Sequence, residues 1–146
     1  MKKETNYIFH HTTSVQIRFN DFDSLEHVNN SVYQNYFDLA RTSYIEQVFE
    51  QKMQWHERGL VLVKITLEFI RPILMDEKVE VKTKIYKLGN KSLGMAQQII
   101  NPETGELKSV SESVMVAYIG SADKPCTIPD DWRKKITRFE SDIEFN

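Results

Sequence analysis

The feature that most constrains the fold is a helical segment that is apolar around most of its circumference. From about Ser31 onward, apolar side chains recur at steps of three and four residues, which is the period of an α-helix. The members of this pattern are Tyr33, Tyr36, Phe37, Ala40, Tyr44 and Val48, with Val32, Leu39, Ile45 and Phe49 widening the apolar face. A helix of this kind is unstable on a surface, so we expect other elements to cover it.

Stretches with the period-two alternation of strands flank the helix. One strand is expected before it, at 15–19, and four after it, at 61–69, 79–85, 92–100 and 110–118. In the second of these strands we expect Val61, Val63, Ile65, Leu67 and Phe69 to share one face.

Short turns at 89–90 and 101–105 join the later strands, and short turns make neighbouring strands antiparallel. We therefore expect the four later strands to form a meander. A short helix is expected at 129–136, where proline and acids come first and bases last. The sequence predicts an α+β fold in a single domain, 1–146, in which an antiparallel sheet wraps around one long central helix.

Charge and cysteine content narrow the possible partners. With 19 Lys+Arg against 21 Asp+Glu, the chain has no basic surplus to attract nucleic acid. Its single cysteine, Cys126, excludes an intramolecular disulfide, which fits the reducing cytoplasm. The longest nearly apolar run, 59–63, is too short to cross a membrane, and no apolar stretch follows Lys2 and Lys3 as in a secretion signal. The sequence predicts a cytoplasmic protein that binds neither nucleic acid nor membrane.

Most of the chemically useful side chains lie between the first strand and the helix. The pattern there is Arg18-Phe19-x-Asp21-x-Asp23-x-x-x-His27-Val28-Asn29-Asn30-x-x-Tyr33-x-x-Tyr36-Phe37. It resembles the signature of hotdog-fold acyl-CoA thioesterases of the 4-hydroxybenzoyl-CoA thioesterase type, with an H-V-N-N motif like that of plant acyl-carrier-protein thioesterases. The likeness continues, in order, through 68–72, 76–79, 87–93 and 128–129. The resemblance implies a hotdog fold.

The resemblance also implies the catalytic residues. The second acid of the D-x-D pair, Asp23, is the catalytic carboxylate, and His27 and Asn30 are expected to orient the reacting groups. Many bacterial relatives have glycine and histidine at the positions of Glu26 and Asn30, and the plant enzymes have asparagine at the position of Leu25. The chain therefore matches neither branch completely.

Four residues are expected to bind the substrate. Asn29 and Tyr33 belong to the same motif, although Asn29 and Asn30 equally suit the role of helix caps. Lys91 and Ser92 match the turn that contacts phosphate in the family, but Gly89-Asn90 replaces the basic pair that some members carry just before it.

Several other polar residues are expected to have no role in the chemistry. Lys82, Lys84 and Lys87 read as part of a solvated strand face, and His10 and His11 as solvent-exposed residues of a polar N-terminal segment. A metal ion held by carboxylates and an imidazole in the motif is a permitted alternative, but the sequence predicts no metal site.

The motif fits the chemistry of thioester hydrolysis. A carboxylate such as Asp23 can act as general base toward water or as nucleophile, and a second acid, Asp21, is then expected to be structural. Backbone N–H groups at the start of the helix near Asn30, or at 59–63, can stabilise the oxyanion. A thiol with a pKa of about 8 to 9 leaves readily without a metal or other cofactor.

We therefore predict an acyl thioester hydrolase that releases a carboxylic acid and a free thiol. The alternatives are a non-catalytic hotdog protein that binds acyl thioesters, and a hotdog hydratase or dehydratase. The carrier, coenzyme A or acyl-carrier protein, and the acyl chain stay open. Exposed sheet edges and a partly covered helix predict a homodimer, and the resemblance adds pairs of dimers forming a homotetramer.

Overall fold

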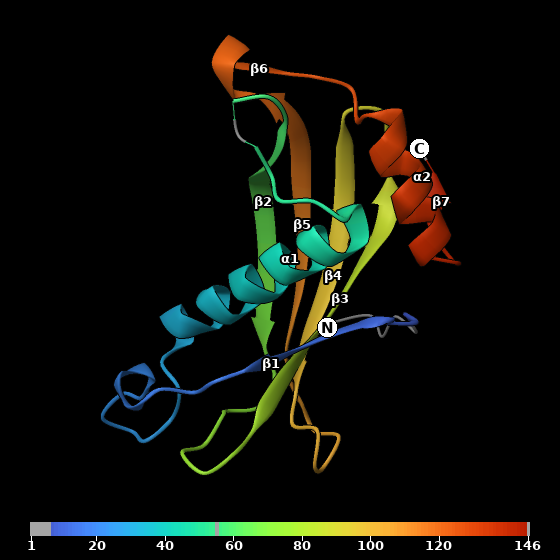
Figure 1. The fold of residues 1–146 in the computed structure, drawn as a ribbon. Helices are drawn as coiled ribbons and strands as arrows, with labels where there is room; N and C mark the ends of the chain where they lie inside the picture. The colour runs from blue at the N-terminus through green and yellow to red at the C-terminus, as the bar shows by residue number, and fades with distance from the viewer. Residues whose placement is uncertain (1–6, 55, 146) are drawn as a thin grey trace.

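The computed structural model describes residues 7–54 and 56–145, and within them helix α1 crosses one face of a curved sheet (Figure 1). The main path of strands across the sheet is β1-β3-β4-β5-β2. The main elements are β1 (His11–Val15), α1 (Tyr33–Phe49), β2 (Gly59–Phe69), β3 (Val79–Leu88), β4 (Ser92–Ile100), β5 (Leu107–Ile119) and α2 (Asp130–Phe139). The short strands β6 (Lys124–Pro125) and β7 (Glu144–Phe145) pair with β5 and β3.

The long central helix is confirmed, and it is buried as its broad apolar face predicted. Its inward side chains join two apolar clusters between the helix and the sheet. Phe37, Ala40, Tyr44 and Phe49 are fully buried, whereas Leu39 stays 53% exposed. The predicted C-terminal helix is also confirmed as α2, and its Trp132 ring packs 5.0 Å from that of Phe49.

The prediction of a four-strand meander is wrong for one strand. β3, β4 and β5 follow one another as antiparallel neighbours, but β2 pairs with β5 and lies at the far edge of the sheet. The connection from β2 to β3, residues 70–78, is no tight turn and is long enough to pass from one edge strand to another part of the sheet. This order leaves β2 as an edge strand.

The predicted faces of β2 are also wrong, because the strand contains a β-bulge. The pairing with β5 skips a residue between Leu62 and Lys64, so Val63 has no partner. One extra residue reverses the alternation. Leu62 therefore packs with the core and lies on the same face as Ile65, so the prediction that Val61 and Val63 share the face of Ile65 is wrong.

The strand predicted at 15–19 is displaced. β1 occupies His11–Val15, and Phe19 begins a 3-10 turn, Phe19–Asp21. The Asp21 carboxylate accepts a hydrogen bond of 2.8 Å from the N–H of Arg18, and the Asp21 N–H donates to the Arg18 carbonyl over 2.9 Å. These local bonds use backbone groups that a continued strand would need.

Two residues expected in solvent are buried. His11 points from β1 toward α1, where its ring lies 5.4 Å from that of Tyr44, and burial lowers its pKa. Lys84 is fully buried because segments near both ends of the chain cover it: its ammonium pairs with Asp142 and donates to the carbonyl of Ile8.

No helix in the described part of the chain is long and apolar enough to cross a membrane.

Candidate active site

The loop that carries Asp23 is held in shape by its own backbone. The Asp23 N–H donates to the carbonyl of His27 over 3.0 Å, and the Glu26 N–H donates to that of Asp23 over 3.1 Å. Glu26 has a left-handed conformation (φ 63°), which closes the turn. The Val28 N–H donates to the Ile73 carbonyl over 2.9 Å. The loop is therefore fixed to the segment that follows β2.

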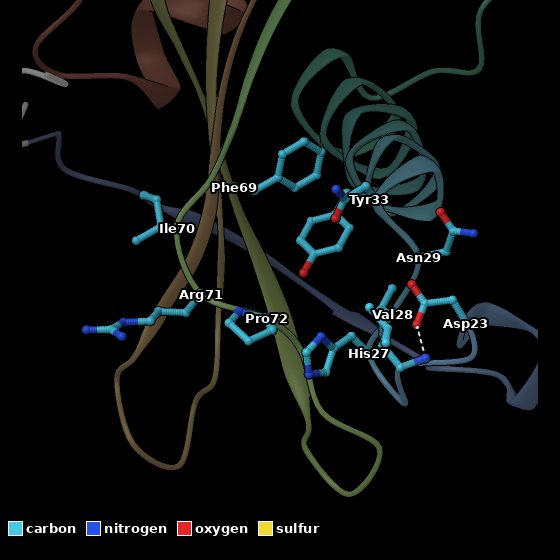
Figure 2. A pocket seen from close by; sticks show the side chains of 11 residues that line it. Asp23, His27, Val28, Asn29, Tyr33, Phe69, Ile70, Arg71 and Pro72 are labelled. Atoms are coloured by element: carbon cyan, nitrogen blue, oxygen red, sulfur yellow. Dashed lines mark hydrogen bonds between the residues drawn. The ribbon is translucent and has the colours of Figure 1, made fainter.

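The side chain of Asp23 is exposed at this loop. One carboxylate oxygen accepts a hydrogen bond of 2.9 Å from the N–H of Leu25. The other oxygen points away from that bond (Figure 2). The bond to Leu25 orients the carboxylate and leaves one oxygen turned away from the loop backbone.

Asp21 has the structural position that its sequence context predicted. The oxygen that accepts from Arg18 also accepts a bond of 2.6 Å from the hydroxyl of Tyr36 in α1. Burial and this contact raise the pKa of Tyr36 above its usual value. Asp21 thus ties the loop to the helix.

A cavity of about 460 Å³ lies beside Asp23, between the start of α1 and the end of β2 (Figure 2). Its lining residues are Asp23, Leu25, His27, Val28, Asn29, Asn30, Tyr33, Phe69, Ile70, Arg71 and Pro72. Five of the seven residues predicted to act on the substrate therefore share one cavity, although they come from a loop and a helix. The wall from Phe69 to Pro72 was not among the predicted site residues, and the only signal for it was that this stretch continues the family resemblance.

Tyr33 supplies a buried aromatic surface to this cavity. Its ring meets that of Phe69 edge to face, with ring centres 5.0 Å apart. Burial raises the pKa of Tyr33, and a bond to the backbone of Ile73 opposes that rise. The hydroxyl therefore stays protonated near neutral pH.

Asn29 is a cap of the turn that leads into α1. Its side-chain oxygen accepts bonds of 3.1 Å from both the N–H and the hydroxyl of Ser31. The Val32 N–H donates to the Asn29 carbonyl over 2.9 Å. The 3-10 turn Asn30–Val32 is thereby set at the edge of the cavity.

His27 lies in the same cavity but is positioned separately from Asp23. It is half-buried and forms a strand-like bridge with Leu74, which follows β2. Within the described residues, no hydrogen bond joins the imidazole to the Asp23 carboxylate. His27 therefore forms a polar part of the cavity wall and is not hydrogen-bonded to the Asp23 carboxylate.

Lys91 and Ser92 do not line the Asp23 cavity. Ser92 pairs with Val116, which also pairs with Val61 near the start of β2. Phe69, at the other end of β2, lines the Asp23 cavity. Within this chain Lys91 and Ser92 therefore do not lie beside Asp23, and the N–H groups at 59–63, at the same end of β2 as Ser92, are also remote from it.

The described residues contain no group of three or more His, Cys, Asp or Glu side chains arranged to hold a metal ion. The metal alternative would use the carboxylates of Asp21 and Asp23 and the imidazole of His27, but the Asp21 carboxylate accepts hydrogen bonds from Arg18 and Tyr36.

Comparison with known proteins places the chain in a family. Residues 17–136 match the model of the thioesterase-like superfamily. Two curated relatives, both from Escherichia coli, are 28% identical to this chain. The acyl-CoA thioester hydrolase YbgC of strain O6:H1 aligns over 79% of this chain and 87% of its own length, and the long-chain acyl-CoA thioesterase FadM of strain K12 over 87% and 97%.

Solved structures show the same architecture. A thioesterase from Thermus thermophilus, complexed with coenzyme A and zinc, is 30% identical, with a TM-score of 0.79 over 91% of this chain and 96% of its own. The PA5185 protein of Pseudomonas aeruginosa, 22% identical, shares the fold with a TM-score of 0.82 over 93% and 95%. The predicted hotdog fold and thioester-hydrolase class are confirmed, and the chain belongs to the thioesterase-like superfamily.

Proposed function

We propose that this enzyme hydrolyses acyl-CoA thioesters and that Asp23 is its catalytic carboxylate. The observation that carries the assignment is the position of Asp23: its carboxylate lines a cavity at the start of α1, oriented by Leu25 through only one of its oxygens. Coenzyme A is favoured over a carrier protein because both curated relatives are named for acyl-CoA substrates.

Asp23 can promote hydrolysis in two ways. As general base it takes a proton from water while the water oxygen bonds to the acyl carbon; the C–S bond then breaks and the thiolate leaves with the electron pair. As nucleophile it attacks the acyl carbon itself and expels the thiolate, and water then cleaves the resulting anhydride. Both routes release one carboxylic acid and one thiol, and both need an ionised carboxylate at this position.

The start of α1 is the proposed oxyanion site. The N–H groups of Ser31 and Val32 already donate to Asn29, so we assign the stabilising role to the N–H of Asn30, supported by the helix dipole. His27 and the Asn30 side chain are proposed to orient the thioester, and Asn29 and Tyr33 to contact it. All of them line the cavity.

A second subunit would complete the site. β2 is an edge strand with an exposed Val63, and twofold antiparallel pairing of two β2 strands sets the Phe69 end of one beside the Gly59 end of the other. Lys91 and Ser92 of the partner subunit would then approach the Asp23 cavity, where the lysine can meet coenzyme A phosphates. The proposed active unit is a homodimer.

Release of free thiol from a panel of acyl-CoAs tests this function. We expect Asp23→Asn, which is nearly isosteric but cannot take up a proton, to lower kcat by roughly a hundredfold or more while the fold is retained. Glu26→Gln is the matched control, because Glu26 lies in the same exposed loop but does not line the cavity. Near-normal kcat in Asp23→Asn would contradict the assignment, and acyl-CoA binding without thiol release by the unmodified protein would favour a non-catalytic binder.

A further inference from the structure

A buried lysine at the start of β5 holds one wall of the Asp23 cavity. Lys108 is 1% exposed, and its ammonium donates a hydrogen bond of 3.1 Å to the carbonyl of Pro72. Its own carbonyl accepts bonds from the N–H groups of Ile70, over 2.9 Å, and of Arg71, over 3.1 Å. Ile70, Arg71 and Pro72 line the cavity (Figure 2). One residue outside the cavity therefore fixes the backbone of three residues in its wall.

Glu77 joins this lysine to the residues that follow the wall. Its Oε1 accepts bonds from the Lys108 ammonium over 2.8 Å and from the Leu74 N–H over 2.9 Å, and its Oε2 accepts from Asn101 Nδ2 over 2.8 Å. Burial acts to raise the pKa of Glu77, but the bonds from Lys108, Asn101 and Leu74 outweigh burial and lower it. Burial acts to lower the pKa of Lys108, but the bonds to Glu106 and Glu77 raise it. Both groups are therefore charged at neutral pH and form an ion pair.

The loop that carries Asp23 docks on the same segment. The Val28 N–H donates to the Ile73 carbonyl over 2.9 Å, and His27 forms an antiparallel bridge with Leu74. The backbone of Leu74 is thus held by the ion pair and lies against the loop. A displacement of Ile73 and Leu74 would therefore move His27 and the catalytic loop with them.

The ion pair also lies close to Tyr33, whose side chain lines the cavity. Burial raises the pKa of Tyr33, a bond to the backbone of Ile73 and the charge of Lys108 lower it, and the charge of Glu77 raises it. The Tyr33 hydroxyl is therefore near both charges and near the segment that they hold. The cavity meets the ion pair through this hydroxyl as well as through its wall.

We propose that Lys108 and Glu77 are positioning residues for thioester hydrolysis, which together hold the wall and the docked loop so that Asp23 faces the acyl carbon. This inference rests on the proposed catalysis at Asp23. Neither Lys108 nor Glu77 lines the cavity, so their role is indirect. Because misplacing a reacting group by about 1 Å lowers a rate by up to roughly a hundredfold, an ion pair outside the cavity can control kcat.

The first test is Glu77→Ala, which removes the acceptor of the Leu74 N–H and one partner of Lys108. We expect kcat to fall about tenfold, with KM changed less than about twofold, on the acyl-CoA that the unmodified enzyme hydrolyses fastest. The acid limb of kcat/KM against pH should keep its midpoint, because Glu77 exchanges no proton with the substrate.

Glu106→Ala is the matched control, because Glu106 is a second carboxylate on the same ammonium. Among the described residues, its side chain bonds to Lys108 and to no residue of 70–77. Both variants should unfold at lower urea concentration, and Glu77→Ala more so, because the side chain of Glu77 is 15% exposed and that of Glu106 is 45% exposed. We expect kcat of Glu106→Ala to stay within about twofold of the unmodified enzyme, because the wall keeps its contacts.

Glu77→Gln separates positioning from stability. It keeps a side-chain oxygen that can accept from the Leu74 N–H, but it loses the charge that Lys108 needs. We expect it to recover most of kcat, to within about threefold of the unmodified enzyme, while its urea midpoint stays low. Amide hydrogen exchange at Leu74 and Val28 should be faster in Glu77→Ala than in Glu106→Ala, because the segment and the docked loop loosen together.

Lys108→Met and the double variant Lys108→Met, Glu77→Ala test whether the two residues act as one unit. We expect kcat of both to lie within about twofold of kcat of Glu77→Ala, because coupled residues have non-additive effects. Losses that multiply in the double variant would overturn the inference.

Three further results would overturn it: an unchanged kcat in Glu77→Ala, an equal loss of kcat in Glu106→Ala, or a lower kcat without faster exchange at Val28. A shifted acid limb in Glu77→Ala would overturn it too, since the charge of Glu77 would then act directly. Each of these results leaves catalysis by Asp23 standing, which Asp23→Asn tests separately. Near-normal kcat in Asp23→Asn would refute the proposed function, whatever the variants of the ion pair do.

Discussion

Two acids only two positions apart have different surroundings, which separates their roles. Asp21 accepts hydrogen bonds from Arg18 and from the buried hydroxyl of Tyr36, whereas Asp23 faces the cavity with one oxygen. We predict that Asp21→Ala lowers the free energy of unfolding by about 1–3 kcal/mol, because it leaves the Tyr36 hydroxyl without its acceptor. Urea unfolding measures the loss, and Glu26→Gln is the control. An unchanged unfolding midpoint would show that the contact with Tyr36 contributes no stability.

His27 shares the cavity with Asp23 but is not bonded to its carboxylate in the described structure. We therefore predict that His27→Ala lowers kcat less than Asp23→Asn does, because it removes an orienting group rather than the base or nucleophile. Steady-state thiol release on the same substrate measures both variants. A loss equal to that of Asp23→Asn would make His27 a full catalytic partner.

At the scale of residues, the motif located the residues that line the Asp23 cavity. Local patterns did not predict the burial of polar residues that distant segments cover. Asp23, His27, Asn29, Asn30 and Tyr33 converge on one cavity because a short loop and the first turn of a helix are adjacent in sequence. The burial of other polar residues was not predictable in this way: His11 is covered by α1, and Lys84 by residues near both ends of the chain. A local sequence pattern does not predict that distant segments cover His11 and Lys84.

At the scale of elements, periodicity located the helices and most strands but missed what interrupts them. The strand 92–100 was predicted with its observed bounds as β4. In β2, the bulge at Val63 reversed the faces, and no pattern of apolar residues distinguishes a bulged strand from a regular one. The first strand was displaced because side-chain hydrogen bonds of Asp21 replace the extended backbone expected there.

Glu140, just after α2, joins three elements. Its carboxylate accepts from the hydroxyl of Tyr44 in α1 and, over 3.3 Å, from the N–H of Ile85 in β3. Burial raises the pKa of Glu140 above 4.5, and the contacts with Tyr44, Lys84 and Ile85 only partly oppose this.

This pKa shift predicts how stability depends on pH. Because the folded protein holds the Glu140 proton more tightly than the unfolded chain, its contribution to stability is complete below about pH 4.5 and is lost as pH rises through the raised folded pKa. Glu140→Gln cannot ionise, so its stability relative to the unmodified protein should increase across that pH interval. Urea unfolding from pH 4 to about pH 8 measures the difference, with the exposed Glu103→Gln as control. A difference that does not change with pH would show that Glu140 keeps an ordinary pKa.

For the whole molecule, the class of fold followed from one argument: a helix apolar on most of its surface needs a sheet around it. The order of strands did not follow, because the connection 70–78 has no turn signal that specifies a neighbour, and β2 became an edge. The strand order also explains why Lys91 and Ser92 lie far from Asp23 within one chain, since the Asp23 cavity and the turn at Lys91 lie at opposite ends of β2.

The separation of Lys91 from Asp23 makes shared sites between subunits testable. Asp23→Asn and Lys91→Glu should each be weakly active alone, the first for lack of a base or nucleophile and the second because it repels coenzyme A phosphates. Refolded together in equal amounts, they should form heterodimers in which one of the two sites is intact, so that about a quarter of all sites recover.

Light scattering after size exclusion should show a dimer, and Val63→Lys, which places a charge on the β2 edge, should weaken it and lower activity in parallel. Fully active monomers at nanomolar concentration, or a mixture no more active than the average of its components, would mean that each chain builds its site alone.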